Sequence, residues 1–126
     1  DFGFHHAIRK SSGDLVFIDF EYFGRDDPVR QLLDFKHHDK NKYARKELKE
    51  TFFEAYSETI PFGEILTRRM AALDPIVGLT WVLIYLNTLS ESYRMQASAR
   101  GRDISQLVAE RLNKGREKLE EVLKIK

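Results

Sequence analysis

The start of the chain has the hydrophobic pattern of a β-hairpin. Two short runs rich in β-forming residues, His6–Lys10 and Leu15–Asp19, are joined by Ser11–Asp14. A four-residue link that contains glycine between two such runs is typical of a hairpin. Because an isolated hairpin buries too little surface to be stable, we expect it to pack on other elements.

After the hairpin, the apolar residues follow a helical period. Asp27 and Pro28 form a typical helix start, because aspartate caps a first turn and proline fits its first position. Helical spacing predicts five segments in all, and Asp74-Pro75 repeats the same start before the fourth. The apolar positions that define the segments are Val29, Leu32, Leu33 and Phe35; Leu48, Phe52, Ala55 and Tyr56; Phe62, Ile65, Leu66 and Met70; Pro75–Leu89; and Ile104, Leu107, Val108, Leu112, Leu119, Val122 and Leu123.

These patterns predict a mainly α (α+β) domain over residues 1–126, with one β-hairpin packed on a bundle of about five helices. The segment Pro75–Leu89 is almost entirely apolar and 15 residues long, which is shorter than the roughly 20 residues that a membrane-spanning helix needs. A helix that is apolar on all sides belongs at the centre of a bundle. We therefore expect a core helix and no membrane partner.

Charge and cysteine content narrow the classes of function. The net charge is +1, and the most basic stretch, Lys36–Glu50, has six bases against three acids. This excess is too small for a typical nucleic-acid-binding protein and indicates a solvated helix face. With no cysteine, the chain has no disulfide and no thiolate metal site. No signal sequence is visible, and we expect a cytoplasmic protein.

Three residues around the hairpin have the spacing of a phosphotransferase site. Such a site needs a carboxylate that accepts a hydroxyl proton, a metal-binding side chain five residues later, and a second, metal-binding aspartate further on. Asp1, His6 and Asp19 occupy these places. Because a hairpin brings its ends together, we expect Asp1 and Asp19 at one edge of a cleft. A carboxylate directly after an apolar strand, as at Asp19, is costly to bury without a partner, which favours metal ligation.

The same part of the chain resembles a known group of enzymes, the aminoglycoside phosphotransferase and choline kinase superfamily, in its C-terminal lobe. The motifs cover about the first 35 residues, and the remainder is similar in its helical layout; the stretch Ile-Asp-Phe-Glu-Tyr is the most specific element. The matching segments are Asp1-Phe-Gly-Phe-His-His-Ala-Ile-Arg9, Leu15-Val-Phe-Ile-Asp-Phe-Glu-Tyr-Phe-Gly24, Asp26-Asp-Pro28 and Leu33-Asp-Phe35.

The resemblance implies a kinase-like fold, with ATP and Mg²⁺ as cofactors. Its substrate would be a small molecule of aminoglycoside, choline or sugar type that is phosphorylated on a hydroxyl group. Asp1 matches the catalytic base, Asp19 matches the Mg²⁺-binding aspartate, and His6 stands where the family usually has asparagine. Asp34 matches an acid that helps to hold the catalytic loop. Glu21 lies on the same side of an extended strand as Asp19, and an auxiliary metal or loop contact is expected there.

The resemblance also implies a second lobe. The glycine-rich loop and the nucleotide-binding lysine of such enzymes belong to an N-terminal lobe, which would precede Asp1 and is missing from this chain. We therefore expect the chain alone to bind ATP weakly, to be inactive, and to self-associate through the lobe surface left exposed.

Other interpretations of these residues remain open. His6 and the missing lobe also fit a non-catalytic helical binding or interaction module with a degenerate kinase motif. The first three residues match the D-F-G of protein kinases, although no activation loop or A-P-E follows them. Asp26 and Asp27 are either a substrate-side acidic patch or, at Asp27, a helix cap.

The other histidines have no assigned chemistry. His5 is expected to be structural, since two neighbours in an extended segment point to opposite faces and only one of them can face the cleft. His37 and His38 lie near a predicted helix end, where imidazoles can interact with the terminal carbonyl groups.

Overall fold

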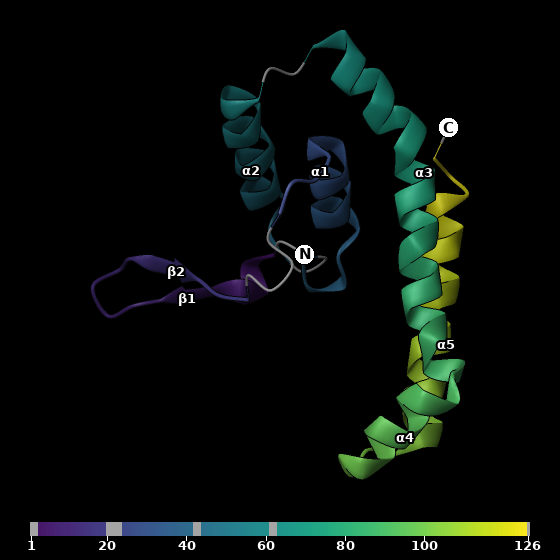
Figure 1. The fold of residues 1–126 in the computed structure, drawn as a ribbon. Coiled ribbons are helices and arrows are strands. Elements are labelled where there is room, and N and C mark those ends of the chain that lie inside the picture. Colours follow the sequence, from purple (N-terminus) through teal and green to yellow (C-terminus); the bar gives the residue numbers. More distant parts are fainter. Residues whose placement is uncertain (1–2, 20–23, 42–43, 61–62, 126) are drawn as a thin grey trace. The chain divides into compact units, whose positions relative to one another are not determined.

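A computed structural model describes residues 3–19, 24–41, 44–60 and 63–125 of the chain (Figure 1). The chain forms two compact units, Asp1–Leu73 and Asp74–Lys126. The described residues contain one two-stranded sheet and five α-helices. The predicted mainly helical α+β class with a small hairpin is therefore confirmed, while the kinase-like lobe stays a prediction.

The hairpin consists of β1 (Ala7–Arg9) and β2 (Leu15–Phe17), which pair antiparallel with Ile8 opposite Val16. Gly13 in the turn has a φ of 94°, a conformation that glycine adopts without steric cost. Beyond the strands, the Ile18 N–H donates to the His6 carbonyl at 2.9 Å. The predicted hairpin is confirmed, and its two ends are held together at the base.

The hairpin does not pack its strands on the helices as expected. Ile8, Leu15 and Phe17 are all exposed. Strands of three residues offer few contacts, and the ribbon is anchored at its base instead, through the short 3-10 helix η1 (Phe4–His6).

The core of the first unit lies along α1 (Pro28–His37). Asp27 caps this helix and Pro28 occupies its first turn, as the sequence predicts. The core residues of α1 are almost completely buried; they are Val29, Leu32, Leu33 and Phe35. After the 3-10 helix η2 (Asp39–Asn41), α2 (Lys46–Thr59) contributes Phe52, whose ring stacks on Phe35 with centroids 3.8 Å apart.

One long helix replaces two predicted ones. We expected a short helix around Ile65–Met70 and a new start at Asp74-Pro75, but α3 runs from Glu64 to Leu86 with Pro75 inside it. Proline in a helix interior removes one backbone hydrogen bond and crowds the preceding turn. The local cap-and-proline signal was therefore overridden, because apolar residues on both sides of Pro75 favour a helix and bury one face.

The second unit contains a helix that the sequence pattern missed. The 3-10 helix η3 (Asn87–Leu89) leads into α4 (Glu91–Ala99), whose first turn is capped by Ser90. The last helix, α5 (Ile104–Val122), is capped by Asp103, whose side chain accepts from the Gln106 N–H at 3.0 Å.

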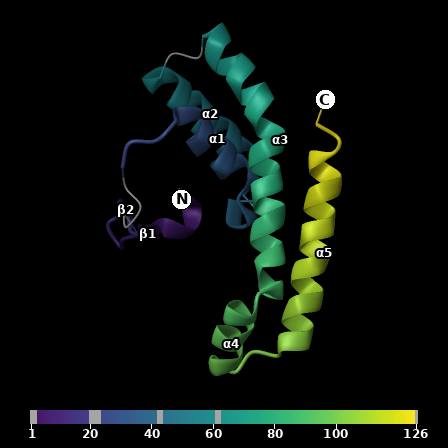
Figure 2. The same ribbon diagram turned by 45° about the vertical axis from the view of Figure 1, so that its right-hand side comes forward.

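The C-terminal part of α3 lies beside α5 (Figure 2). A Cβ atom at Gly115 would lie 3.5 Å from the Tyr85 Cβ, so the two helices approach closely there. The buried face of α5 contains Leu107, Gly115 and Val122. The predicted apolar stripe is thus wrong in part, because its members Leu112, Leu119 and Leu123 are exposed.

The apolar segment of α3 is also less buried than expected. Its exposed side chains follow one helical face, and they are Ile76, Leu79, Leu83 and Ile84. Glu64–Leu89 is long and apolar enough to cross a membrane, with a mean hydropathy of 1.5 in a window that is 22% buried. The sequence-based length of 15 residues for this apolar helix was therefore too short, because the helix does not begin at Pro75. Core helices of globular proteins share this length and composition.

Candidate functional site

Two of the predicted site residues meet at the base of the hairpin. His6 Nε2 lies 3.2 Å from Asp19 Oδ2. The backbone hydrogen bond between Ile18 and His6 fixes the segments that carry them. The His6 side chain is largely buried, whereas 46% of the Asp19 side chain is exposed. The carboxylate can therefore contact His6 on one side and solvent or a ligand on the other.

Asp19 has an unusual backbone conformation. Its φ is 69°, and it is the one non-glycine residue with a positive φ in the described part of the chain. Aspartate tolerates the left-handed region better than most residues, but the conformation still costs free energy. Such strain is often found at functional sites. Here it falls on the residue that the sequence assigns to the metal.

Two further histidines, His5 and His38, lie beside this pair. The ring of His5 lies 3.8 Å from that of His6 and 4.4 Å from that of His38, measured between centroids. The Lys40 N–H donates to His38 Nδ1 at 3.0 Å, so this nitrogen is an acceptor. Burial, and then the neighbouring His5, lower the pKa of His38 to about 4. Burial and His6 also lower the pKa of His5. Neutral imidazoles can stack closely without charge repulsion.

A buried asparagine that sequence analysis missed holds the segment before the hairpin. Asn41 is fully buried, and its Oδ1 accepts from the Phe4 N–H at 3.3 Å. Its Nδ2 donates to the Phe35 carbonyl at 3.1 Å. The ring of Phe4 meets the ring of Phe35 edge to face, with centroids 5.4 Å apart. Nothing in the charged stretch around Asn41 marks it in the sequence, because its partner lies 37 residues away.

The structure describes only one of the remaining predicted site residues, Asp34. Asp34 lies on α1, where its Oδ2 is 3.4 Å from Arg30 Nε and its carbonyl accepts from the His38 N–H. Its predicted contact with the catalytic loop stays a prediction. Asp1 and Glu21 lie outside the described residues, so their roles as base and auxiliary ligand also stay predictions.

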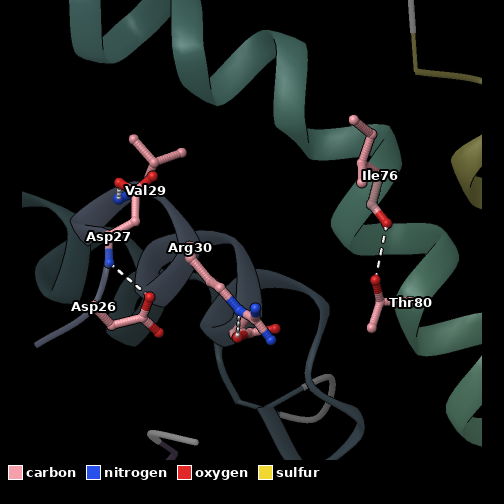
Figure 3. A network of polar contacts seen from close by, with 7 residues as sticks. Asp26, Asp27, Val29, Arg30, Ile76 and Thr80 are labelled. Carbon is pink, nitrogen blue, oxygen red and sulfur yellow. Dashed lines mark hydrogen bonds and ion pairs between the residues drawn. The ribbon is translucent and has the colours of Figure 1, made fainter. Parts of the chain in front are cut away.

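Asp26 and Asp27 lie at the start of α1 (Figure 3). Asp27 Oδ1 accepts from the Val29 N–H at 3.0 Å, and its Oδ2 contacts Arg69. The Asp27 N–H in turn donates to Asp26 Oδ1 at 2.7 Å. The helix-cap interpretation of Asp27 is confirmed, and both of its carboxylate oxygens have protein partners.

The residues at the hairpin base fit Mg²⁺ through Asp19. Mg²⁺ is usually held by one or two carboxylates together with waters and substrate phosphates. The half-exposed carboxylate of Asp19 matches this pattern. An imidazole is a softer ligand, so His6 is better placed to position Asp19, whose Oδ2 lies 3.2 Å from the His6 Nε2. Within the described residues, no group of three or more His, Cys, Asp or Glu side chains forms a metal site.

Comparison of the chain with protein-family models, curated proteins and solved structures found no match. Its function must therefore be argued from the residues of the site.

Proposed function

We propose that this chain is the helical, catalytic-loop part of a small-molecule kinase that resembles the aminoglycoside phosphotransferases and choline kinases. In the whole protein, a preceding lobe would supply the glycine-rich loop and the lysine that bind ATP. The substrate would be a small molecule with a free hydroxyl group. In this proposal, neither ATP binding nor turnover is expected from residues 1–126 alone, and self-association through the exposed lobe surface stays a prediction.

The observation that carries the proposal is the approach of His6 to Asp19 at 3.2 Å. These two positions are 13 residues apart in sequence, and the resemblance assigns both to the metal. The hairpin between them doubles back as the proposal requires. The positive φ of Asp19 supports it further, because residues held in this region are often found at functional sites.

The proposed reaction is in-line transfer of the γ-phosphoryl group of ATP to the substrate hydroxyl. Mg²⁺, when bound, neutralises charge on the phosphate oxygens. Asp19 would hold the ion, and His6 would orient the carboxylate of Asp19. Asp1 would orient the hydroxyl and accept its proton as the new O–P bond forms and the bond to ADP breaks. The products are a phosphate monoester, ADP and one proton.

A non-catalytic interaction module is the second candidate, and the exposed face of α3 favours it. Ile76, Leu79, Leu83 and Ile84 form an apolar helix face of the kind that marks interaction surfaces. The two candidates differ in one respect that can be measured. A kinase gains stability from Mg²⁺ and ATP together, whereas a degenerate module does not.

The test uses the chain together with the nucleotide-binding lobe that the proposal places before Asp1. Thermal unfolding is measured with and without Mg²⁺ and ATP, and ADP formation is followed with hydroxyl substrates. We expect the nucleotide to raise the Tm by several degrees, because a ligand that binds only the folded state stabilises it by mass action. Asp19→Asn should abolish this rise.

Asp14→Asn is the matched control. Asp14 lies at the other end of the same hairpin, where it accepts from the Ser12 hydroxyl, and asparagine keeps an acceptor oxygen there. This variant should keep the full response to Mg²⁺ and ATP. A wild-type protein that folds but shows no response would favour the interaction module, and an equal response in Asp19→Asn would contradict the assigned metal residue.

A further inference from the structure

The segment Gly3–His6 places His6 next to Asp19. Contacts within this segment do not determine its position relative to α1. Within the segment, the His6 N–H donates to the Gly3 carbonyl at 3.0 Å. This bond closes the turn of η1 but does not fix the turn relative to α1. The contacts that fix it are the edge-to-face contact of the Phe4 ring with Phe35 of α1 and the contacts of two residues after α1, Asn41 and His38.

Asn41 links two backbone groups that are far apart in sequence. Its Oδ1 accepts from the Phe4 N–H, and its Nδ2 donates to the Phe35 carbonyl in the last turn of α1. These two bonds therefore join the η1 turn to the last turn of α1. No aliphatic side chain could serve both groups, because one needs an acceptor and the other a donor.

Asn41 is itself held rigidly. Its N–H donates to the His38 carbonyl at 3.0 Å, and its carbonyl accepts from the Ala44 N–H at 3.0 Å. The side chain is fully buried, so water does not compete for its amide. A rigid, desolvated amide sets the distance between the η1 turn and α1 more narrowly than an exposed contact would.

Gly3 completes the contact. A Cβ atom at this position would lie 2.5 Å from the His5 ring and 3.2 Å from Asn41 Oδ1. A side chain here would therefore displace the His5 ring and press on the amide. The backbone of Gly3 is extended, so a substitution would act through this close contact and not through backbone strain.

We propose that Asn41 is a positioning residue, whose side-chain amide clamps the turn Gly3–His6 to the end of α1 and thereby sets His6 against Asp19. The inference deepens the proposed kinase function, since it depends on that function for the chemical role of the His6–Asp19 pair. The clamp itself acts without metal, nucleotide or substrate.

The clamp is tested in the 126-residue chain by NMR, without added metal. The first measurement is hydrogen exchange of the Phe4 amide, and the second is the nuclear Overhauser contact between the His6 ring and the Asp19 β-protons. In Asn41→Ala, we expect Phe4 exchange to be about tenfold faster, as for the loss of one hydrogen bond, and the His6–Asp19 contact to be lost.

Gly3→Ala is the second variant, because Asn41→Ala leaves buried polar groups unpaired and can unfold the first unit. The added methyl group strains the clamp without removing any buried partner, and it should weaken the same two signals. Gly24→Ala is its control, since a Cβ atom at Gly24 meets nothing within 4 Å.

Tyr56→Phe is the control for general destabilisation. The Tyr56 hydroxyl donates to Gln31 Oε1 at 2.9 Å in the same unit, whereas the Asn41 side chain bonds to Phe4 and Phe35. Its removal should lower the Tm and leave both Phe4 exchange and the His6–Asp19 contact unchanged. If Asn41 has a purely structural role, Asn41→Ala should also lower the Tm and leave Phe4 exchange and the His6–Asp19 contact unchanged. This outcome would overturn the proposal.

Retention of both signals in Gly3→Ala would also overturn it. Failure of the clamp and failure of the kinase proposal remain distinguishable, because these signals are read in the metal-free chain. A wild-type protein that shows the clamp but no response to Mg²⁺ and ATP contradicts the kinase function alone.

Discussion

His38 combines a buried ring with two defined neighbours. It stacks on His5 and accepts the Lys40 N–H through Nδ1, and its pKa falls from 6.5 to about 4. A proton on Nδ1 would remove the acceptor and place a charge against the neighbouring imidazole. Neutral His38 is therefore part of the structure that surrounds the candidate site.

This arrangement predicts a pH dependence of stability. Between about pH 4 and 6.5, the unfolded chain binds a proton at His38 that the folded chain does not. The contribution is thus fully present above pH 6.5 and is lost as the pH falls toward 4, with an amplitude of roughly 2 to 3 kcal/mol. Urea unfolding of the wild-type chain and of His38→Asn at several pH values measures it.

His38→Asn isolates the effect, because an asparagine oxygen can accept from the N–H two residues later without titrating. The difference in unfolding free energy between the two proteins should change across this pH window. A difference that stays constant from pH 7 to 4 would show that His38 titrates alike in both states.

Local sequence signals predicted the role of Asp27 correctly but gave no indication of the role of Asn41. Asp27 was expected as a cap because the cap and its partner N–H are two residues apart. Asn41 could not be expected, since its partners, Phe4 and Phe35, are set by the packing of three segments. The approach of His6 to Asp19 was suggested by the motif spacing, and its geometry comes from the hairpin register.

At the scale of elements, α3 differs most from the sequence-based prediction. The same signal, aspartate followed by proline, starts α1 at Asp27 but does not start a helix at Asp74. Such a signal starts a new helix only where the preceding residues are not already helical. Ile65–Met70 is already helical, so α3 continues through Pro75. The pattern shows the two apolar segments but not whether they join.

The continuity of α3 predicts unequal effects of replacing two prolines by alanine. Pro75→Ala should raise the unfolding free energy by about 1 to 3 kcal/mol, because interior proline costs a helix up to about 3 kcal/mol relative to alanine. Pro28→Ala should change it little, since proline suits the first turn of α1. Denaturant unfolding of both variants measures the difference. Nearly equal effects would indicate that Pro75 begins a helix after all.

Two further elements show where periodicity fails. Residues Glu91–Ala99 have few apolar side chains, so α4 is visible in the sequence only through the capping serine at 90. In α5, the apolar stripe was correct as a helix signal, but the buried face includes Gly115 and Lys118 and omits Leu119. The close approach of α3 to α5 favours a small residue at Gly115, and a pattern of hydrophobic residues does not indicate such a position.

At the scale of the whole molecule, two compact units divide at Leu73, within α3. The first unit carries His6, Asp19 and the clamp, and it also leaves both faces of the hairpin exposed. The second unit exposes the apolar face of α3. Exposed apolar surface of this kind marks interaction surfaces.

In the proposed function, the hairpin base binds a divalent cation through Asp19. Paramagnetic Mn²⁺ in place of Mg²⁺ tests it most directly, through the broadening of amide signals in the NMR spectrum of the 126-residue chain. We expect selective broadening around His6 and Asp19, which is lost in Asp19→Asn and kept in Asp14→Asn. Broadening centred elsewhere, or unchanged in Asp19→Asn, would contradict it.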